Sequence, residues 1–348
     1  MACATSTSTP DIVAVRAAIF PTDNGDGQIL IFGNTRPDAI DDPTQRSEIG
    51  RINCRTPTET RPHTAHPRLN AAIFGQAFLG DGRLLLAGGT PDVSGAGLAK
   101  NRLVAGGERR KCETCTATSS FADAADLKPD RDGRGEVRGE RQLTLCTLGT
   151  GEILALDGTS GREPGAERYQ PLADRWVQLP KARRQPSDAN RRLHCHLLAD
   201  GDVFIASPFV NNSYCTKLDP WTGIAHPQAE YLPDPGYWDG SLPSVLLPLV
   251  PGNNYTPRIL LCGQHPSQLL DFNYPSWHWQ SVPRTGAMAS TRRLGSCATL
   301  LPTGQVLLTG GTAAASSQPE LYDPPFNAAC QQHDYGVGSW KTLQGAAT

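Results

Sequence analysis

The sequence lacks the features that direct a protein to nucleic acid or into a membrane. Its 348 residues carry a formal net charge of −2, and no apolar run approaches the roughly 18 residues that a membrane helix requires. The first residues, MACATSTSTPDIV, contain neither the basic segment nor the apolar segment of a secretory signal. We therefore expect no nucleic-acid partner and no membrane association, and we favour a cytoplasmic location.

Lysine is scarce. It occurs at six positions, so that arginine supplies most of the 32 basic residues. The forked guanidinium group of arginine binds carboxylates, phosphates and sulfates with two hydrogen bonds, which a lysine ammonium does not. Two interpretations stay open: the arginines recognise anions, or they reflect a compositional bias of the genome.

The ten cysteines do not have the spacing of a dense disulfide scaffold. Only Cys112 and Cys115 form a close pair. Their spacing suits a metal, but a zinc site needs four ligands, and the nearest complement is the pair His194 and His196. We expect a local disulfide or free thiols at this pair.

What the sequence does contain is a repeated segment. LLPTGQVLLTGGT (300–312) nearly repeats FLGDGRLLLAGGT (78–90), and TLGTGEILALDGT (147–159) and LLADGDVFIASPF (197–209) follow the same outline. Each has an apolar run, a turn with glycine, a second apolar run and a break of small residues. This pattern predicts a β-hairpin whose glycine adopts a backbone conformation that other residues avoid.

Two further hairpins, at 13–35 and 244–264, bring the number to six. Each is followed by short strand-like segments, as in ERYQPLADRWVQLP (167–180), so the unit is four strands over about 45–60 residues, the size of a propeller blade. We therefore predict an all-β protein, one kelch-type β-propeller domain over residues 1–348. It has six blades in this chain, or seven if a segment outside it closes the ring. The polar segment 91–140 is expected to be a long insertion between the second and third blades.

Several of these segments resemble the propeller of the galactose oxidase and glyoxal oxidase family. IVAVRAAIFPT (12–22) is similar to the first strand of that propeller, GQAFLGDGRLLLAGG (75–89) to its second hairpin, and PELYDP (319–324) to an outer strand of its sixth blade. The resemblance implies oxidation of alcohols or aldehydes by copper and a tyrosyl radical that is crosslinked to cysteine. In that family the cysteine and the tyrosine each lie nine residues before a hairpin glycine.

The residues at these two positions do not fit the implied chemistry. Nine residues before Gly82 stands Ile73, and nine residues before Gly151 stands Gln142. Neither side chain can form a thioether or a phenoxyl radical, and a copper site needs several ligands that converge on one ion. We predict no cofactor, copper included, unless sequence outside this chain supplies the ligands.

Polar residues instead stand at the starts of the predicted innermost strands, which converge at the mouth of a propeller. We predict a pocket for a small anionic or sugar-like ligand, or a surface for a protein partner, built from Arg141, Gln142, Arg192, His194, Trp238 and Arg293. His194 and Asp239 are the candidate acid–base pair if the protein is an enzyme. A structural alternative stays open, in which these arginines bridge neighbouring blades and His194 packs in the core.

Three functions are compatible with these residues. The first is a propeller that lacks the copper radical site and binds a ligand or a partner. The second is an enzyme that acts on an anionic small molecule through the Arg/His/Asp mouth without a metal radical. The third is a copper radical oxidase that is completed by sequence outside this chain.

Overall fold

The computed structural model describes the strands and turns that carry the fold. They are residues 13–20, 28–34, 48–53, 59–63, 74–89, 101–105, 120–127, 143–156, 166–179, 182, 193–206, 214–231, 242–251, 254–263, 266–272, 279–285, 293, 295–311, 318–325 and 336–343. Within these ranges no helix is both long enough and apolar enough to cross a membrane. By their contacts the residues divide into two compact units, Met1–Ala189 and Asn190–Thr348.

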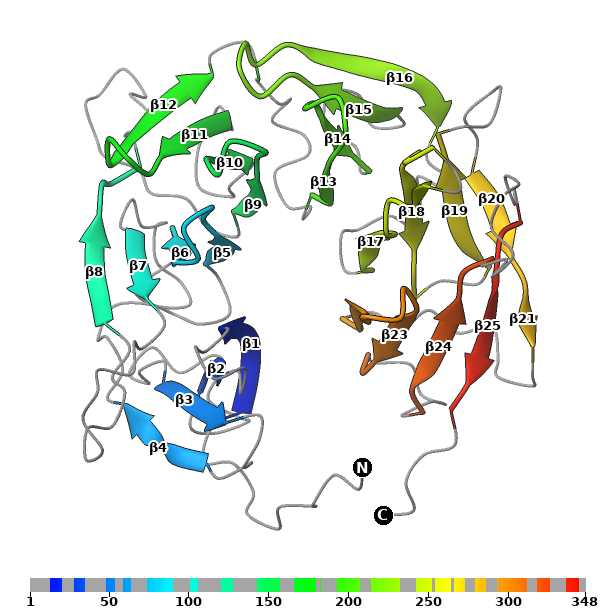
Figure 1. Cartoon of the computed structure of the whole chain (residues 1–348), viewed down its shortest axis with the longest axis horizontal. Coiled ribbons are helices and arrows are strands. Elements are labelled where there is room, and N and C mark those ends of the chain that lie inside the picture. The colour runs from blue at the N-terminus through cyan, green and yellow to red at the C-terminus, as the bar shows by residue number, and fades with distance from the viewer. Residues whose placement is uncertain are drawn as a thin grey trace. The chain divides into compact units, whose positions relative to one another are not determined.

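The first unit contains three four-stranded antiparallel sheets (Figure 1). Sheet 1 comprises β1 (Val13–Phe20), β2 (Gln28–Asn34), β3 (Glu48–Asn53) and β4 (Glu59–His63). Sheet 2 comprises β5 (Gly75–Phe78), β6 (Leu84–Ala87), β7 (Asn101–Ala105) and β8 (Ser120–Ala124). Sheet 3 comprises β9 (Thr144–Thr147), β10 (Ile153–Leu156), β11 (Ala166–Gln170) and β12 (Arg175–Leu179).

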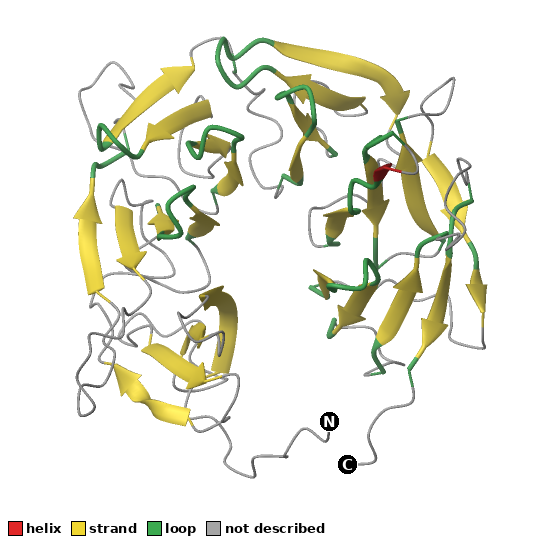
Figure 2. Ribbon diagram, viewed as in Figure 1, coloured by secondary structure: helices red, strands yellow, loops and turns green. Residues whose placement is uncertain are grey.

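The second unit repeats this arrangement, and strands again dominate it (Figure 2). Sheet 4 comprises β13 (Cys195–Leu197), β14 (Val203–Ile205), β15 (Tyr214–Leu218) and β16 (Ala225–Tyr231). Sheet 5 comprises β17 (Ser244–Leu246), β18 (Arg258–Leu261), β19 (Ser267–Asp271) and β20 (Trp279–Val282). Sheet 6 comprises β22 (Cys297–Leu300), β23 (Val306–Thr309), β24 (Glu320–Asp323) and β25 (Ser339–Thr342), and the short β21 (Arg284–Thr285) pairs with β25 in parallel.

All six predicted hairpins are present, each as the first two main strands of one sheet. Four of them share one turn. Its glycine has a positive φ between 81° and 92° and donates its N–H to the carbonyl three residues earlier at 2.9–3.1 Å; these are Gly82, Gly151, Gly201 and Gly304. Because only glycine adopts this conformation without strain, the recurring glycine of the sequence repeat is explained.

Neighbouring sheets of one unit bury a shared apolar core. Tyr169 and Trp176 of sheet 3, with ring centroids 5.1 Å apart, pack against the leucines of sheet 2. Tyr322 and Trp340 of sheet 6 form the equivalent pair at 5.4 Å, against the apolar face of sheet 5. The tyrosine and the tryptophan face each other across paired strands, at the registers Tyr169–Trp176 and Tyr322–Trp340.

The structure corrects one boundary that the sequence predicted. Residues 91–140 are not one insertion, because 101–105 and 120–124 are the outer strands β7 and β8 of sheet 2. Outer strands of a sheet reach solvent and tolerate polar residues, so the period of apolar residues that marks a strand is weak there. The rest of 91–140, apart from 125–127, lies outside the described residues.

Candidate functional site

The structure places only part of the predicted site. Arg141, Gln142, Arg192, Trp238 and Asp239 lie outside the described residues, as do Cys112 and Cys115, so those predictions stand untested. His194 and Arg293 are described, and both belong to the second unit. Their surroundings show what two of the predicted positions do.

Arg293 is buried, with 2% of its surface exposed. Its Nε and Nη2 donate to the carbonyl of Gly310 at 3.0 and 2.7 Å, and its Nη1 donates to the carbonyl of Gln318 at 3.1 Å. Nη1 also forms an ion pair at 3.1 Å with the buried carboxylate of Glu320.

The backbone of Arg293 makes a further link, because its N–H donates to the carbonyl of Gly263 in sheet 5 at 2.7 Å. The residue therefore joins sheets 5 and 6. Most of its guanidinium donors bind the protein itself, which is the structural alternative that the sequence left open.

A second link joins sheets 4 and 5. His196 on β13 and Ser244 on β17 form a hydrogen bond between Nε2 and Oγ at 2.7 Å. Burial, and next to it the charge of neighbouring His194, lowers the pKa of His196 to about 3. A serine beside a histidine is one part of a nucleophilic site, but a base with so low a pKa takes up few protons at neutral pH. We therefore interpret the pair as a link between two sheets.

This pKa predicts how stability depends on pH. Unfolded His196 has an ordinary pKa near 6.5, above its folded value of about 3, so the unfolded state takes up a proton first as the pH falls. Stability from this group is complete above pH 6.5 and is lost below it, by about 2 kcal/mol at pH 5. Urea unfolding at pH 7.5 and pH 5 should show a smaller difference for His196→Gln than for the unchanged protein. Equal differences for the two proteins would contradict the assignment.

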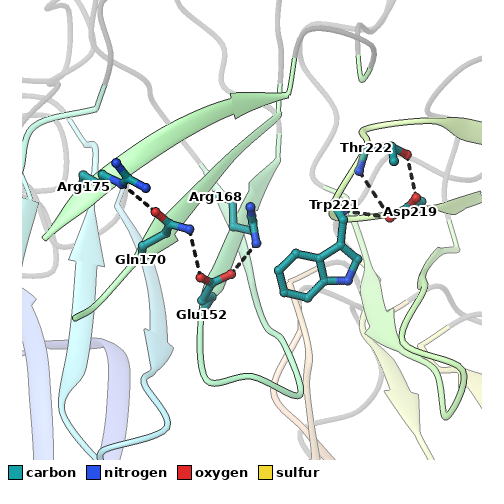
Figure 3. Close-up of polar contacts among 7 residues, drawn as sticks. All are labelled: Glu152, Arg168, Gln170, Arg175, Asp219, Trp221 and Thr222. Atoms are coloured by element: carbon teal, nitrogen blue, oxygen red, sulfur yellow. Dashed lines mark hydrogen bonds and ion pairs between the residues drawn. The ribbon is translucent and has the colours of Figure 1, made fainter. Parts of the chain in front are cut away.

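Sheet 3 carries a polar chain that the sequence did not predict (Figure 3). Arg168 Nη1 donates to Glu152 Oε2 at 2.6 Å, and Gln170 Nε2 donates to Glu152 Oε1 at 3.2 Å. Arg175 Nε then donates to Gln170 Oε1 at 2.6 Å. The four residues come from three strands, or the turn before one, and alternate positions along a strand share a face, so sequence spacing alone does not reveal the chain.

The turn that joins β15 and β16 holds an exposed tryptophan (Figure 3). Asp219 Oδ1 accepts from the backbone N–H groups of Trp221 and Thr222 at 2.8 and 3.3 Å, and Oδ2 accepts from Thr222 Oγ1 at 2.6 Å. Burial acts to raise the pKa of Asp219, but the hydrogen bonds from Thr222 and Trp221 hold that pKa below its ordinary value. The motif DPWTG thus forms a rigid Asx turn, with the side chain of Trp221 facing solvent.

A metal centre needs several ligand side chains that converge on one point. Within the described ranges, no group of three or more His, Cys, Asp or Glu side chains is close enough to hold a metal ion.

The architecture matches a solved structure over nearly the whole chain. That structure is a fungal alcohol oxidase of the AA5 family in complex with copper, and the match covers 96% of this chain with a TM-score of 0.64 and 17% sequence identity. The chain has the galactose oxidase-like propeller fold. It spans 66% of the length of the matched oxidase chain. The structure of YjhT matches more weakly, with a TM-score of 0.45 and 12% identity over 68% of this chain and 71% of that chain.

No protein-family model matches the sequence, and no curated protein matches it either. At 17% identity the likeness to the copper oxidase establishes the fold and leaves the chemistry to the residues. At the two positions where the resemblance implies a radical site, this galactose oxidase-like propeller has Ile73 and Gln142, and the donor set does not fit copper.

Proposed function

We propose that this protein is a galactose oxidase-like propeller without the copper radical site, which binds a small anionic or sugar-like ligand at the starts of its innermost strands. One observation carries the proposal. The fold follows that of a copper oxidase over 96% of the chain, whereas an aliphatic side chain and an amide stand at the positions of the redox pair.

The hairpin glycines support the register on which these two positions depend. Gly82 and Gly151 have φ values of 83° and 81° and the same turn hydrogen bond, so they occupy the same position in successive sheets. Counting back nine residues from each therefore starts from structurally equivalent points. It arrives at Ile73 and Gln142.

The ligand-binding residues that we propose are Arg141, Gln142, Arg192, His194 and Trp238. Arg141 and Arg192 stand ten and nine residues before the equivalent glycines Gly151 and Gly201. Two guanidinium groups at matching positions repel each other without an anion between them and form paired hydrogen bonds with one. Arg293 differs from them, because its guanidinium is engaged within sheet 6.

Anion binding tests this proposal. Titration calorimetry with phosphate, sulfate and glucuronate as probes should detect binding to the unchanged protein by at least one of them. Arg192→Ala and Arg141→Ala should each weaken that binding by about tenfold or more, which corresponds to about 1.4 kcal/mol. Arg83→Ala is the matched control, because Arg83 forms an exposed ion pair with Asp81 in a hairpin turn and should change nothing.

Two other outcomes would redirect the proposal. Near-stoichiometric copper by elemental analysis, with a radical signal by electron paramagnetic resonance, would favour the oxidase completed by other sequence. Turnover of an anionic metabolite without metal, lost in His194→Ala, would favour the metal-independent enzyme. Binding of the probes that is unchanged in both arginine variants would remove the pocket.

A further inference from the structure

The residue three positions after each hairpin glycine reports whether the next face of its sheet is covered. In sheets 2, 3 and 4 this residue is Leu85, Leu154 or Phe204, and each is fully buried at 0% exposure. In sheet 6 the equivalent residue is Leu307, which is partly exposed. One face of sheet 6 is therefore open to solvent.

The strand register shows which residues share the open face. Thr299, Leu307, Leu321 and Lys341 are paired in one row across the four main strands of sheet 6. All of them are partly or fully exposed. The row beside it includes Val306, Tyr322 and Trp340, which point the other way and are buried against sheet 5. We call the first row, with Cys297 and Thr309, the open face.

Elsewhere in the chain the following sheet covers this face. Leu85, Ala87 and Leu103 of sheet 2 pack against the core residues of sheet 3. In the second unit, Phe204 and Ala206 of sheet 4 pack against Ile259, Leu261 and Leu270 of sheet 5. Sheet 5 covers its own next face in the same way, with Leu260 and Cys262 against sheet 6.

The equivalent faces thus establish what kind of surface fits the open face, namely the apolar side of another twisted β-sheet. Two half-exposed leucines on paired strands are a residue choice suited to burial. β25 is the last strand that the structure describes, and the matched oxidase has about a third more polypeptide than this chain covers.

We propose that the open face of sheet 6 binds one further antiparallel β-sheet, supplied by polypeptide outside these 348 residues. The sheet would cover Leu307 and Leu321, as sheet 5 covers Phe204 of sheet 4. This proposal does not depend on the ligand-binding function, because it concerns the face of one sheet and not the starts of the inner strands.

Cys297 gives a built-in probe. It is exposed and lies on the open face, since it pairs with Thr309, whereas Cys146 is buried in sheet 3. Iodoacetamide labelling, followed by peptide mass spectrometry, should modify Cys297 quickly in the 348-residue chain. In the protein purified natively from its source, Cys297 should react at least 100-fold more slowly, and the intact mass should include polypeptide beyond these 348 residues. Cys146 should stay unlabelled in both samples and serves as the control.

Variants separate a covered face from general protection. In the native assembly, Leu321→Lys should restore the labelling of Cys297, because it places a charge on the open face. Thr303→Lys should leave Cys297 protected, because Thr303 lies in the exposed hairpin turn of the same sheet.

Three results would overturn the proposal. The first is equal reactivity of Cys297 in the two samples. The second is protection in the 348-residue chain alone, which would mean that its own residues cover the face. The third is a native assembly that contains only copies of this 348-residue chain.

Discussion

Replacing Arg293 by methionine should lower the free energy of unfolding by about 3–5 kcal/mol, the cost of breaking a buried ion pair by removing one partner. The side chain and its partner Glu320 are each 2% exposed, so water cannot replace the lost contacts. Carbonyl groups at Gly310 and Gln318 lose their guanidinium donors at the same time. Methionine fills a similar volume, so the effect reports the polar contacts and not a cavity. Urea unfolding followed by tryptophan fluorescence measures the change.

The same sheet offers a matched control for Arg293. Lys341 forms an ion pair with Asp323 at 3.6 Å, and about half of each side chain is exposed. An exposed pair of this kind contributes at most about 1 kcal/mol, so Lys341→Ala should change stability little. Equal effects for the two variants would contradict the buried, sheet-joining role of Arg293. Loss of anion binding by Arg293→Met with unchanged stability would return this residue to the ligand pocket.

The hairpins could be predicted from the sequence because their determinants are local. In each of the four related turns, a glycine with positive φ and the flanking apolar strands lie within about a dozen residues, a span that one sequence segment contains. The Tyr169–Trp176 pair is of the same kind, since only a short turn separates the two residues. Local rules of this sort also led to the resemblance, and the match to a galactose oxidase-like fold confirms the fold class.

The role of Arg293 could not be predicted because its partners are distant in sequence. Gly310 and Glu320 lie 17 and 27 residues away, and Gly263 belongs to the preceding sheet. An arginine at a strand start has the same sequence signature whether it faces a ligand or bridges two sheets. The link between His196 and Ser244 spans 48 residues and was missed for the same reason. Pairing across sheets depends on the three-dimensional arrangement, which sequence spacing does not specify.

Replacing Gly80 by alanine should destabilise the first unit by about 1–3 kcal/mol, the usual cost of overpacking a close-packed contact. A Cβ atom at Gly80 would lie 2.9 Å from the Cα of Gly151, a backbone atom in the hairpin of the next sheet that no side-chain rotation can move away. Sheets 2 and 3 also meet here through the hydrogen bond that Thr147 Oγ1 donates to the carbonyl of Phe78 at 2.7 Å. A forced separation of the hairpins would therefore weaken that bond as well.

Gly149 provides the comparison that isolates this contact, since it stands two residues before Gly151 as Gly80 stands two before Gly82. Nothing lies within 4 Å of a Cβ atom placed at Gly149, so Gly149→Ala should be neutral or slightly stabilising through the reduced entropy of the unfolded chain. Thermal and urea unfolding of the two variants measure the difference. Equal stability of Gly80→Ala and Gly149→Ala would show that the two hairpins do not touch, and that neighbouring sheets of this propeller are held by their apolar cores alone.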